Sequence, residues 1–330
     1  MAKKIHVVIA GASGETGGSI ANGLLESPET FVTFQDLTVL ARPSSVDKAA
    51  YHELRDRGVT VVSANLGTVS ADLVAILDGV DVVISCLIVT DMDAMNNLAT
   101  ACKKAGVGRF VPSLFGPVCP PRGVMQLRDL KEDLVDFIKT LYLPYTLIDV
   151  GWWYQMLLPS LPSLPSGKID HSIVFPVKSI VGNGHTQTAL IDNRDIGKYV
   201  ARIIVDPRTL NKSVFVYNEI WTQNQLFDLL EHLSTETLER NYMSAEDLQN
   251  KMEDLKKKSA IDGQRHQMGI SLLAYDYSLW VRGDNMPENA KYLGYLDGKE
   301  LYPNFQARSL EQYFKGILEG SIGRIYVGRR

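Results

Sequence analysis

Short apolar runs alternate with helical patterns through the first half of the chain, which predicts a parallel sheet with crossover helices. The runs are rich in Val, Ile and Leu, as expected of strands that are covered on both faces. The predicted strands are Ile5–Ala10, Leu37–Ala41, Val59–Ser63, Val80–Ser85, Arg109–Pro112 and Tyr145–Val150. The predicted helices between them include Gly18–Leu25, Ala71–Leu77, Met95–Ala105 and Leu127–Leu141. Right-handed crossovers would wind these strands into a doubly wound parallel sheet of the Rossmann type, in the α/β class.

The pattern changes after Gly151. Repeated prolines and serines over Pro159–Gly167 predict a loop. Beyond it, strands are expected around Ser172–Gly182, Gln187–Asp192 and Ser213–Tyr217, and helices from Asp195 and over Gln223–Leu233 and Ser244–Lys257. We therefore predict a nucleotide-binding Rossmann domain over residues 1–151. A second, smaller α/β substrate domain over 152–330 would interleave with it, and the cleft between them would hold the ligand.

Composition narrows the class of protein. The 330 residues are 45% apolar and 22% charged, and the net charge of −4 gives no basic face for nucleic acid. Acidic residues, Asp78 and Asp91 among them, interrupt the longest apolar runs, and the N-terminus lacks a signal-peptide pattern. The three cysteines, Cys86, Cys102 and Cys119, have no metal-ligand spacing. We expect a cytoplasmic monomer or homodimer with a small-molecule substrate and no nucleic-acid, membrane or metal partner.

A glycine-rich segment joins the first predicted strand to the first helix. It reads Gly11-Ala-Ser-Gly-Glu-Thr-Gly17, a G-x-x-G-x-x-G pattern in a strand–turn–helix context. The first glycine permits a sharp turn, the second lets backbone N–H groups approach a diphosphate, and the third permits close packing of helix on strand. The helix N-terminus adds unpaired N–H donors and a positive dipole end. Dinucleotide contacts are expected from Gly11, Ser13, Gly14, Glu15, Thr16 and Gly17.

The end of the second predicted strand indicates which dinucleotide is bound. NAD sites usually place Asp or Glu there, where the carboxylate accepts from the ribose 2′-hydroxyl. Here the strand ends Leu40-Ala41-Arg42-Pro43 and carries no acid. A guanidinium at this point can pair with the 2′-phosphate of NADP through charge-assisted hydrogen bonds. Arg42 therefore favours NADP(H) as the cofactor.

Several segments together resemble one known family. They are Gly11–Gly17, Val39–Pro43, Ala105–Gly116, Leu143–Thr146, Asp195–Tyr199, Asp206–Lys212, Val281–Asn285 and Glu300–Pro303. In order and spacing they are similar to the isoflavone reductase-like, or NmrA-like, branch of the atypical short-chain dehydrogenases. That family includes plant phenylpropanoid reductases and fungal enzymes and regulators. The resemblance covers the whole chain and implies an NADPH-dependent reductase of secondary metabolism.

The resemblance also implies a catalytic lysine. The family's reductases carry a lysine thirteen residues before Pro-Tyr-Thr, and the matching position is Lys131, ahead of Pro144-Tyr145-Thr146. Its amine would act as the general acid/base and would lie near the bound nicotinamide. The chain departs from the family at Ser113-Leu114-Phe115-Gly116, where Leu114 replaces the usual glutamate. The loss of this carboxylate puts ordinary reductase chemistry in question.

Further side chains are candidates for the ligand site. Aromatic residues that follow predicted strands could stack on the nicotinamide or enclose an aromatic substrate: Phe115, Trp152, Trp153 and Tyr154. Leu114 and His185 are weaker substrate candidates, and the stiff loop Pro117–Gly123 is expected to form part of the substrate wall. The charged helix at Glu246–Lys258 is interpreted as a solvated face.

Three functions fit these residues. The first is NADPH-dependent reduction of a small aromatic or polycyclic substrate, with Lys131 transferring the proton. The second is a non-redox cyclisation or isomerisation on a protein that keeps NADP bound, an alternative that Leu114 keeps open. The third is a regulator that senses NADP without turnover. Lys131 favours an enzyme, because regulators of this kind commonly lack the lysine.

Overall fold

The computed structural model describes residues 5–26, 36–88, 90–159, 161, 179–322 and 325, and the chain divides into two compact units. The first unit comprises Met1–Phe115, Leu130–Asp149 and Asn193–Val216. The second unit comprises Gly116–Asp129, Val150–Asp192 and Tyr217–Arg330. A segment from beyond residue 151, 193–216, thus belongs to the first unit.

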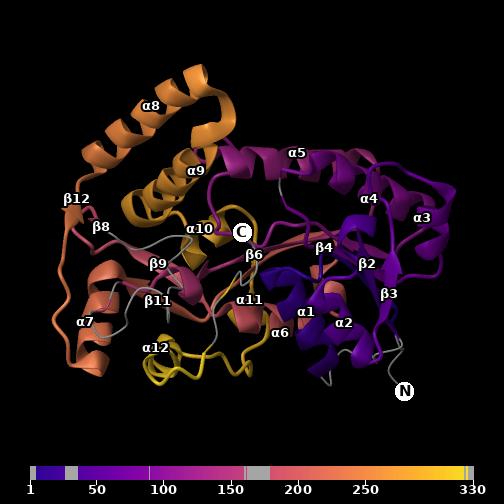
Figure 1. Ribbon diagram of the computed structural model, residues 1–330, viewed down its shortest axis with the longest axis horizontal. Coiled ribbons are helices and arrows are strands. Elements are labelled where there is room, and N and C mark those ends of the chain that lie inside the picture. Colours follow the sequence, from indigo (N-terminus) through magenta and orange to yellow (C-terminus); the bar gives the residue numbers. More distant parts are fainter. Residues whose placement is uncertain are drawn as a thin grey trace. The chain divides into compact units, whose positions relative to one another are not determined.

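The first unit is built on a five-stranded parallel sheet in the order β3-β2-β1-β4-β5 (Figure 1). Its strands are β1 (Val7–Ala10), β2 (Leu37–Ala41), β3 (Thr60–Ser63), β4 (Val82–Ser85) and β5 (Arg109–Val111). A parallel bridge from Phe110 to Tyr145 leads on to β6 (Thr146–Val150), which pairs with β10 (Lys212–Val216). This order confirms the predicted doubly wound sheet. Its winding reverses between β1 and β4, the point where such sheets bind ligands.

Helices cover both faces of this sheet (Figure 1). On one face lie α3 (Ala71–Ile76), α4 (Met92–Lys104) and α5 (Gln126–Thr140), and on the other lie α1 (Glu15–Glu26), α2 (Ala49–Asp56) and α6 (Asn193–Ile203). Leu73, Leu98 and Ile138 from the first set are fully buried against Val8 and Val83 of the sheet. Every residue of β1 and β4 is buried, which explains why all of them except Ser85 are apolar.

Helices α1 and α6 approach each other unusually closely. A Cβ on Gly23 would overlap the backbone of Gly197, and one on Gly197 would overlap the backbone of Ser19. The Ser19 hydroxyl donates to the Asn193 carbonyl over 2.6 Å and accepts from the Gly197 N–H over 3.1 Å. The helix that follows the glycine turn is therefore fixed by a segment 174 to 178 residues away in the sequence.

The described part of the second unit has two small sheets and a set of helices. One sheet joins β7 (Trp152–Trp153), β9 (Gln187–Ile191) and β11 (Glu219–Thr222), and the other joins β8 (Ile180–Val181) and β12 (Tyr242–Met243). Its helices are α7 (Gln223–Ser234), α8 (Ala245–Asp262), α9 (Gln267–Asp276), a π-helix (Tyr277–Arg282), α10 (Pro287–Tyr292), α11 (Gly298–Leu301) and α12 (Leu310–Leu318). Among the described residues, the remaining short elements are β13 (Leu296–Asp297) and the 3-10 helices Pro43–Ser45, Tyr154–Met156, Pro207–Thr209 and Gly263–His266.

The sequence predicted β9, α7 and most of α8. The greater part of the predicted Pro159–Gly167 loop, and the beginning of the predicted strand Ser172–Gly182, lie outside the described residues. Within the described part of the chain, no helix is both long and apolar enough to cross a bilayer.

Candidate cofactor and ligand sites

The glycine turn after β1 has no space for side chains at its first and third glycines. Gly11 has a φ of +92°, and a Cβ built on it would lie 2.7 Å from the Cys86 carbonyl oxygen. A Cβ on Gly17 would overlap the backbone of Gly11 and lie 2.7 Å from the Ala12 Cα. The Gly14 N–H donates to the Gly11 carbonyl over 3.1 Å and closes the turn. Close backbone contacts at Gly11 and at Gly17 therefore fix the conformation of this turn.

Helix α1 begins directly at this turn. Its first intrahelical hydrogen bond runs from the Gly18 N–H to the Gly14 carbonyl over 2.7 Å, so the preceding N–H groups of the first turn have no acceptor within the helix. The helix dipole adds partial positive charge at the same place. A turn without side chains in front of such donors fits a dinucleotide diphosphate.

Arg42 lies directly after β2, on the same edge of the parallel sheet as the glycine turn. Its side chain is exposed, and its guanidinium forms no ion pair with any described residue. Its carbonyl accepts from the Ser45 N–H over 2.8 Å, which fixes the backbone but not the side chain. The guanidinium is therefore available to an anionic ligand.

Lys131, on α5, contacts the turn that follows β5 at this edge. The Lys131 amine donates to the Leu114 carbonyl. The Leu114 N–H donates to the Pro112 carbonyl over 2.8 Å in a tight turn, and Phe115 has a φ of +30°. The Phe115 N–H donates to the Ile148 carbonyl over 2.9 Å. Such strained conformations persist where the surroundings fix them, and they cluster at functional sites.

The Leu114 side chain itself is turned into the core. It is 1% exposed and packs with Val135 and Leu147. The residue that replaces the family's glutamate thus contributes its carbonyl to Lys131 and its side chain to the interior.

The predicted aromatic residues have different surroundings. Tyr154 is fully buried, and its hydroxyl donates to Glu219 over 2.8 Å, so both its ring and its polar group are used by the core of the second unit. Trp153 is 8% exposed. Trp152 is half-buried, and its ring lies 5.0 Å from that of Tyr275 at an angle of 40°. Of these residues, Trp152 contacts the ring of Tyr275, which lines the pocket described below.

His185 is exposed on the turn after β8. Its Nε2 lies 3.4 Å from the Asn224 amide nitrogen, and its backbone N–H donates to the Asn183 side chain over 3.0 Å. Among the described residues no cluster of His, Cys, Asp and Glu has the arrangement of a metal site.

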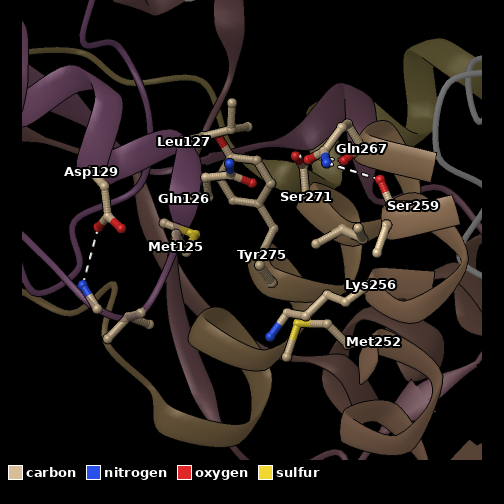
Figure 2. A pocket seen from close by; sticks show the side chains of 15 residues that line it. Met125, Gln126, Leu127, Asp129, Met252, Lys256, Ser259, Gln267, Ser271 and Tyr275 are labelled. Atoms are coloured by element: carbon tan, nitrogen blue, oxygen red, sulfur yellow. Dashed lines mark hydrogen bonds between the residues drawn. The ribbon is translucent and has the colours of Figure 1, made fainter. Parts of the chain in front are cut away.

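The second unit contains a pocket of about 470 Å³ (Figure 2). This volume lies within the range of roughly 300–1,000 Å³ that is typical of small-molecule sites. Three segments line the pocket: the chain leading into α5, helix α8 and helix α9. The lining residues are Gly123, Val124, Met125, Gln126, Leu127, Asp129, Met252, Lys256, Ser259, Ala260, Gln267, Ile270, Ser271, Ala274 and Tyr275. Sequence reasoning missed this set, because the charged residues of α8 were interpreted as a solvated face.

Burial changes the titration of two groups near these sites. It raises the pKa of the Cys86 thiol, which lies beside the glycine turn, and so favours the protonated form. It also raises the pKa of Asp276, the last residue of α9, to about 7. The Asp276 carboxyl is thus partly protonated at neutral pH.

Comparison with known proteins places the chain in a family. The sequence profile of the NmrA-like family matches residues 2–274. Asnovolin J 5′,6′-dehydrogenase of Aspergillus novofumigatus (strain IBT 16806) is 46% identical over 323 residues, which are 96% of each chain. Probable pinoresinol-lariciresinol reductase 3 of Arabidopsis thaliana is 27% identical over 96% of this chain and 98% of its own.

A solved structure shows the same fold. The complex of AtPrR2 with NADP+ and (+)pinoresinol has a TM-score of 0.76 and 24% identity, and the match covers 96% of this chain and 99% of that one. The family resemblance found in the motifs is confirmed by these matches. The chain belongs to the NmrA-like family.

Proposed function

We propose that this chain is an NADPH-dependent oxidoreductase that acts on a small aromatic or polycyclic substrate of secondary metabolism. The glycine turn carries the proposal, because its geometry excludes side chains at Gly11 and Gly17 and it lies at the positive, N-terminal end of α1, where a diphosphate can bind. Support comes from the relatives, which are named as reductases or a dehydrogenase, and from AtPrR2, whose structure holds NADP+.

The cofactor would be bound by residues of the first unit. Gly11, Gly14 and Gly17 shape the turn, while Ser13, Glu15 and Thr16 supply backbone or hydroxyl donors near the diphosphate. Arg42 would pair with the adenosine 2′-phosphate and so select NADP(H) over NAD(H). Phe115 would lie against the nicotinamide end. NADPH, when bound, supplies a hydride at its nicotinamide ring.

Lys131 would transfer the proton that accompanies the hydride. Its amine is held at the Leu114 carbonyl, so its position is set by the backbone at the end of β5. Lys131 could donate a proton to a substrate oxygen during reduction and remove one during dehydrogenation. The 46% identical relative is named a dehydrogenase, so both directions belong in the test.

The test compares Lys131→Met with Lys139→Met, an exposed lysine later on the same helix. Purified protein is titrated with NADPH and NADH and then assayed with (+)-pinoresinol, aromatic ketones and polycyclic enones. We expect Lys131→Met to lose turnover by about 100-fold or more, as removal of a general acid does. NADPH affinity should stay within a few-fold of the parent, and Lys139→Met should behave like the parent.

Two results would contradict the proposal. One is absence of NADPH association, or a preference for NADH. The other is full turnover in Lys131→Met. Tight NADPH binding without turnover of any acceptor by the parent protein would instead support a nucleotide sensor.

A further inference from the structure

The floor of the pocket in the second unit is aliphatic and rich in sulfur. Met125 is 3% exposed and packs with Cys119 and Ala274, with Met252 and Tyr275 against the same cluster. Methionine side chains are unbranched and polarizable, so they adapt to irregular surfaces. Such a floor suits a non-planar hydrocarbon framework.

The aromatic content of the pocket is small. Tyr275 is the single aromatic residue among the described side chains that line it, and its ring is already tilted at 40° against Trp152. A flat aromatic ligand is usually held by stacking on one or more rings. The lining does not offer a pair of rings between which such a ligand could insert.

Most polar groups of the lining already have partners. Asp129 accepts from the Gly123 N–H over 3.1 Å. The Gln267 amide donates to the Ser259 hydroxyl over 3.1 Å, and the Ser271 hydroxyl donates to the Gln267 carbonyl over 2.9 Å (Figure 2). These groups make a satisfied polar wall that does not need a ligand.

Lys256 also lines the pocket, but unlike these polar groups its amine is held by an exposed ion pair. It lies one helical turn after Met252 on α8, so the two side chains share a face, as Figure 2 shows. Its amine is 2.7 Å from the Glu253 carboxylate, in a pair in which both side chains are about half exposed. Exposed pairs of this kind contribute little and exchange readily with other partners. The Lys256 amine can therefore turn to a ligand oxygen at the rim of the aliphatic floor.

We propose that this pocket binds the carbon framework of the substrate, and that it selects a largely saturated polycycle carrying a carboxylate that pairs with Lys256. This inference rests on the proposed function and narrows its substrate class from aromatic or polycyclic to alicyclic. The framework packs on Met125, Met252, Ile270 and Ala274, and the carboxylate is held by Lys256.

The experiment uses three matched probes on the full chain, with and without NADP+. Lithocholic acid is a saturated tetracycle with a carboxylate, and its C24 alcohol has the same framework without the charge. Pyrene-1-butyric acid is a planar aromatic tetracycle with a carboxylate. By calorimetry, lithocholic acid should bind about tenfold or more tighter than either of the other two, since shape and charge both favour it.

Three variants locate the binding. Lys256→Met should weaken lithocholic acid about tenfold and leave the alcohol unchanged, because it removes the charge but keeps the stem. Met252→Trp, at a half-buried position, should weaken both steroids by filling the floor. Lys257→Met, an exposed neighbour outside the lining, should match the parent, and melting temperatures verify that every variant is folded.

The inference is overturned if lithocholic acid does not bind, if pyrene-1-butyric acid binds as tightly, or if Lys256→Met keeps full affinity for the acid. The separate NADPH titration distinguishes this failure from failure of the proposed function. If the protein binds NADPH but does not bind lithocholic acid, only the pocket assignment is refuted. Absence of binding by either NADP form refutes the oxidoreductase whatever the steroids do.

Discussion

In the first unit, an arginine lies at each end of the parallel strands, and the two guanidinium groups have opposite surroundings. At the carboxyl end of β2, Arg42 is exposed and its guanidinium forms no ion pair within the described residues. At the amino end of β5, Arg109 is 7% exposed and fully engaged. Its guanidinium donates to the Ile203 carbonyl over 2.7 Å, to the Thr209 hydroxyl over 2.9 Å and to the Asp206 carbonyl over 3.0 Å.

The same contrast holds for the neighbouring strands. At the amino end, the His6 N–H donates to the Asp81 carboxylate over 2.9 Å, and the His6 ring lies 3.1 Å from the Thr38 hydroxyl. At the carboxyl end, the first-turn donors of α1 have no partner within their helix. Polar groups that are satisfied internally stabilise the fold, while N–H groups that the helix itself does not satisfy can contribute to binding. We therefore expect the amino end of the sheet to serve stability and the carboxyl end to serve ligand recognition.

The largest expected effect tests the backbone of the carboxyl end. Gly17→Ala places a methyl group on the backbone of Gly11 and Ala12, whereas Gly18→Ala places one 3.6 Å from the nearest atom, an ordinary contact. The first change must displace the turn, and we expect it to weaken NADPH binding by about 3 kcal/mol or more, over 100-fold. Fluorescence titration with NADPH measures this, with melting temperature as the check on folding. Equal affinities in the two variants would show that the turn does not form the diphosphate site.

The next effect tests the amino end. Arg109→Met removes three charge-assisted hydrogen bonds and leaves buried carbonyls with fewer donors, which should cost roughly 2–4 kcal/mol of unfolding free energy. Arg208→Met is the control, because Arg208 pairs with Asp206 at the same turn but is 59% exposed. Its loss should cost about 0–1 kcal/mol. Urea denaturation compares the two variants, and NADPH affinity should be unchanged in both. A loss of NADPH affinity in Arg109→Met would contradict the division between the two ends.

The sequence predicted the strands and the turn at the carboxyl end because these features depend on local order in the chain. The glycine spacing, the strand before it and Arg42 after the second strand are all adjacent in the chain, and periodicity places the strands. The start of α1 was predicted at Gly18 but lies at Glu15, because the turn residues themselves enter the helix. Arg109 was predicted only as the start of a strand, since its three acceptors lie about a hundred residues later.

The pocket could not be predicted for the same physical reason. Its lining comes from residues 123–129, α8 and α9, and no short motif links segments more than a hundred residues apart. The charges of α8 indicated a solvated face, yet Met252 and Lys256 on that helix line the pocket. Leu114 was a substrate candidate because it departs from the family motif. Its burial against Val135 and Leu147 became evident only when α5 and β6 were placed.

The smallest expected effect is a change in NADPH affinity at Arg42, which completes the comparison of Arg42 with Arg109. Arg42→Gln removes an exposed charge that no described side chain pairs with, so stability should be unchanged. NADPH affinity should fall by about 2 kcal/mol, or roughly thirtyfold, while NADH affinity stays the same. Arg55→Gln, at a half-buried position on α2, is the control and should keep the parent's preference. Because Arg42 is exposed, salt should screen its interaction with the phosphate. The parent's preference for NADPH should therefore shrink between low and high NaCl, while that of Arg42→Gln stays flat. If the preference for NADPH over NADH changes with neither the substitution nor the salt concentration, another residue binds the 2′-phosphate.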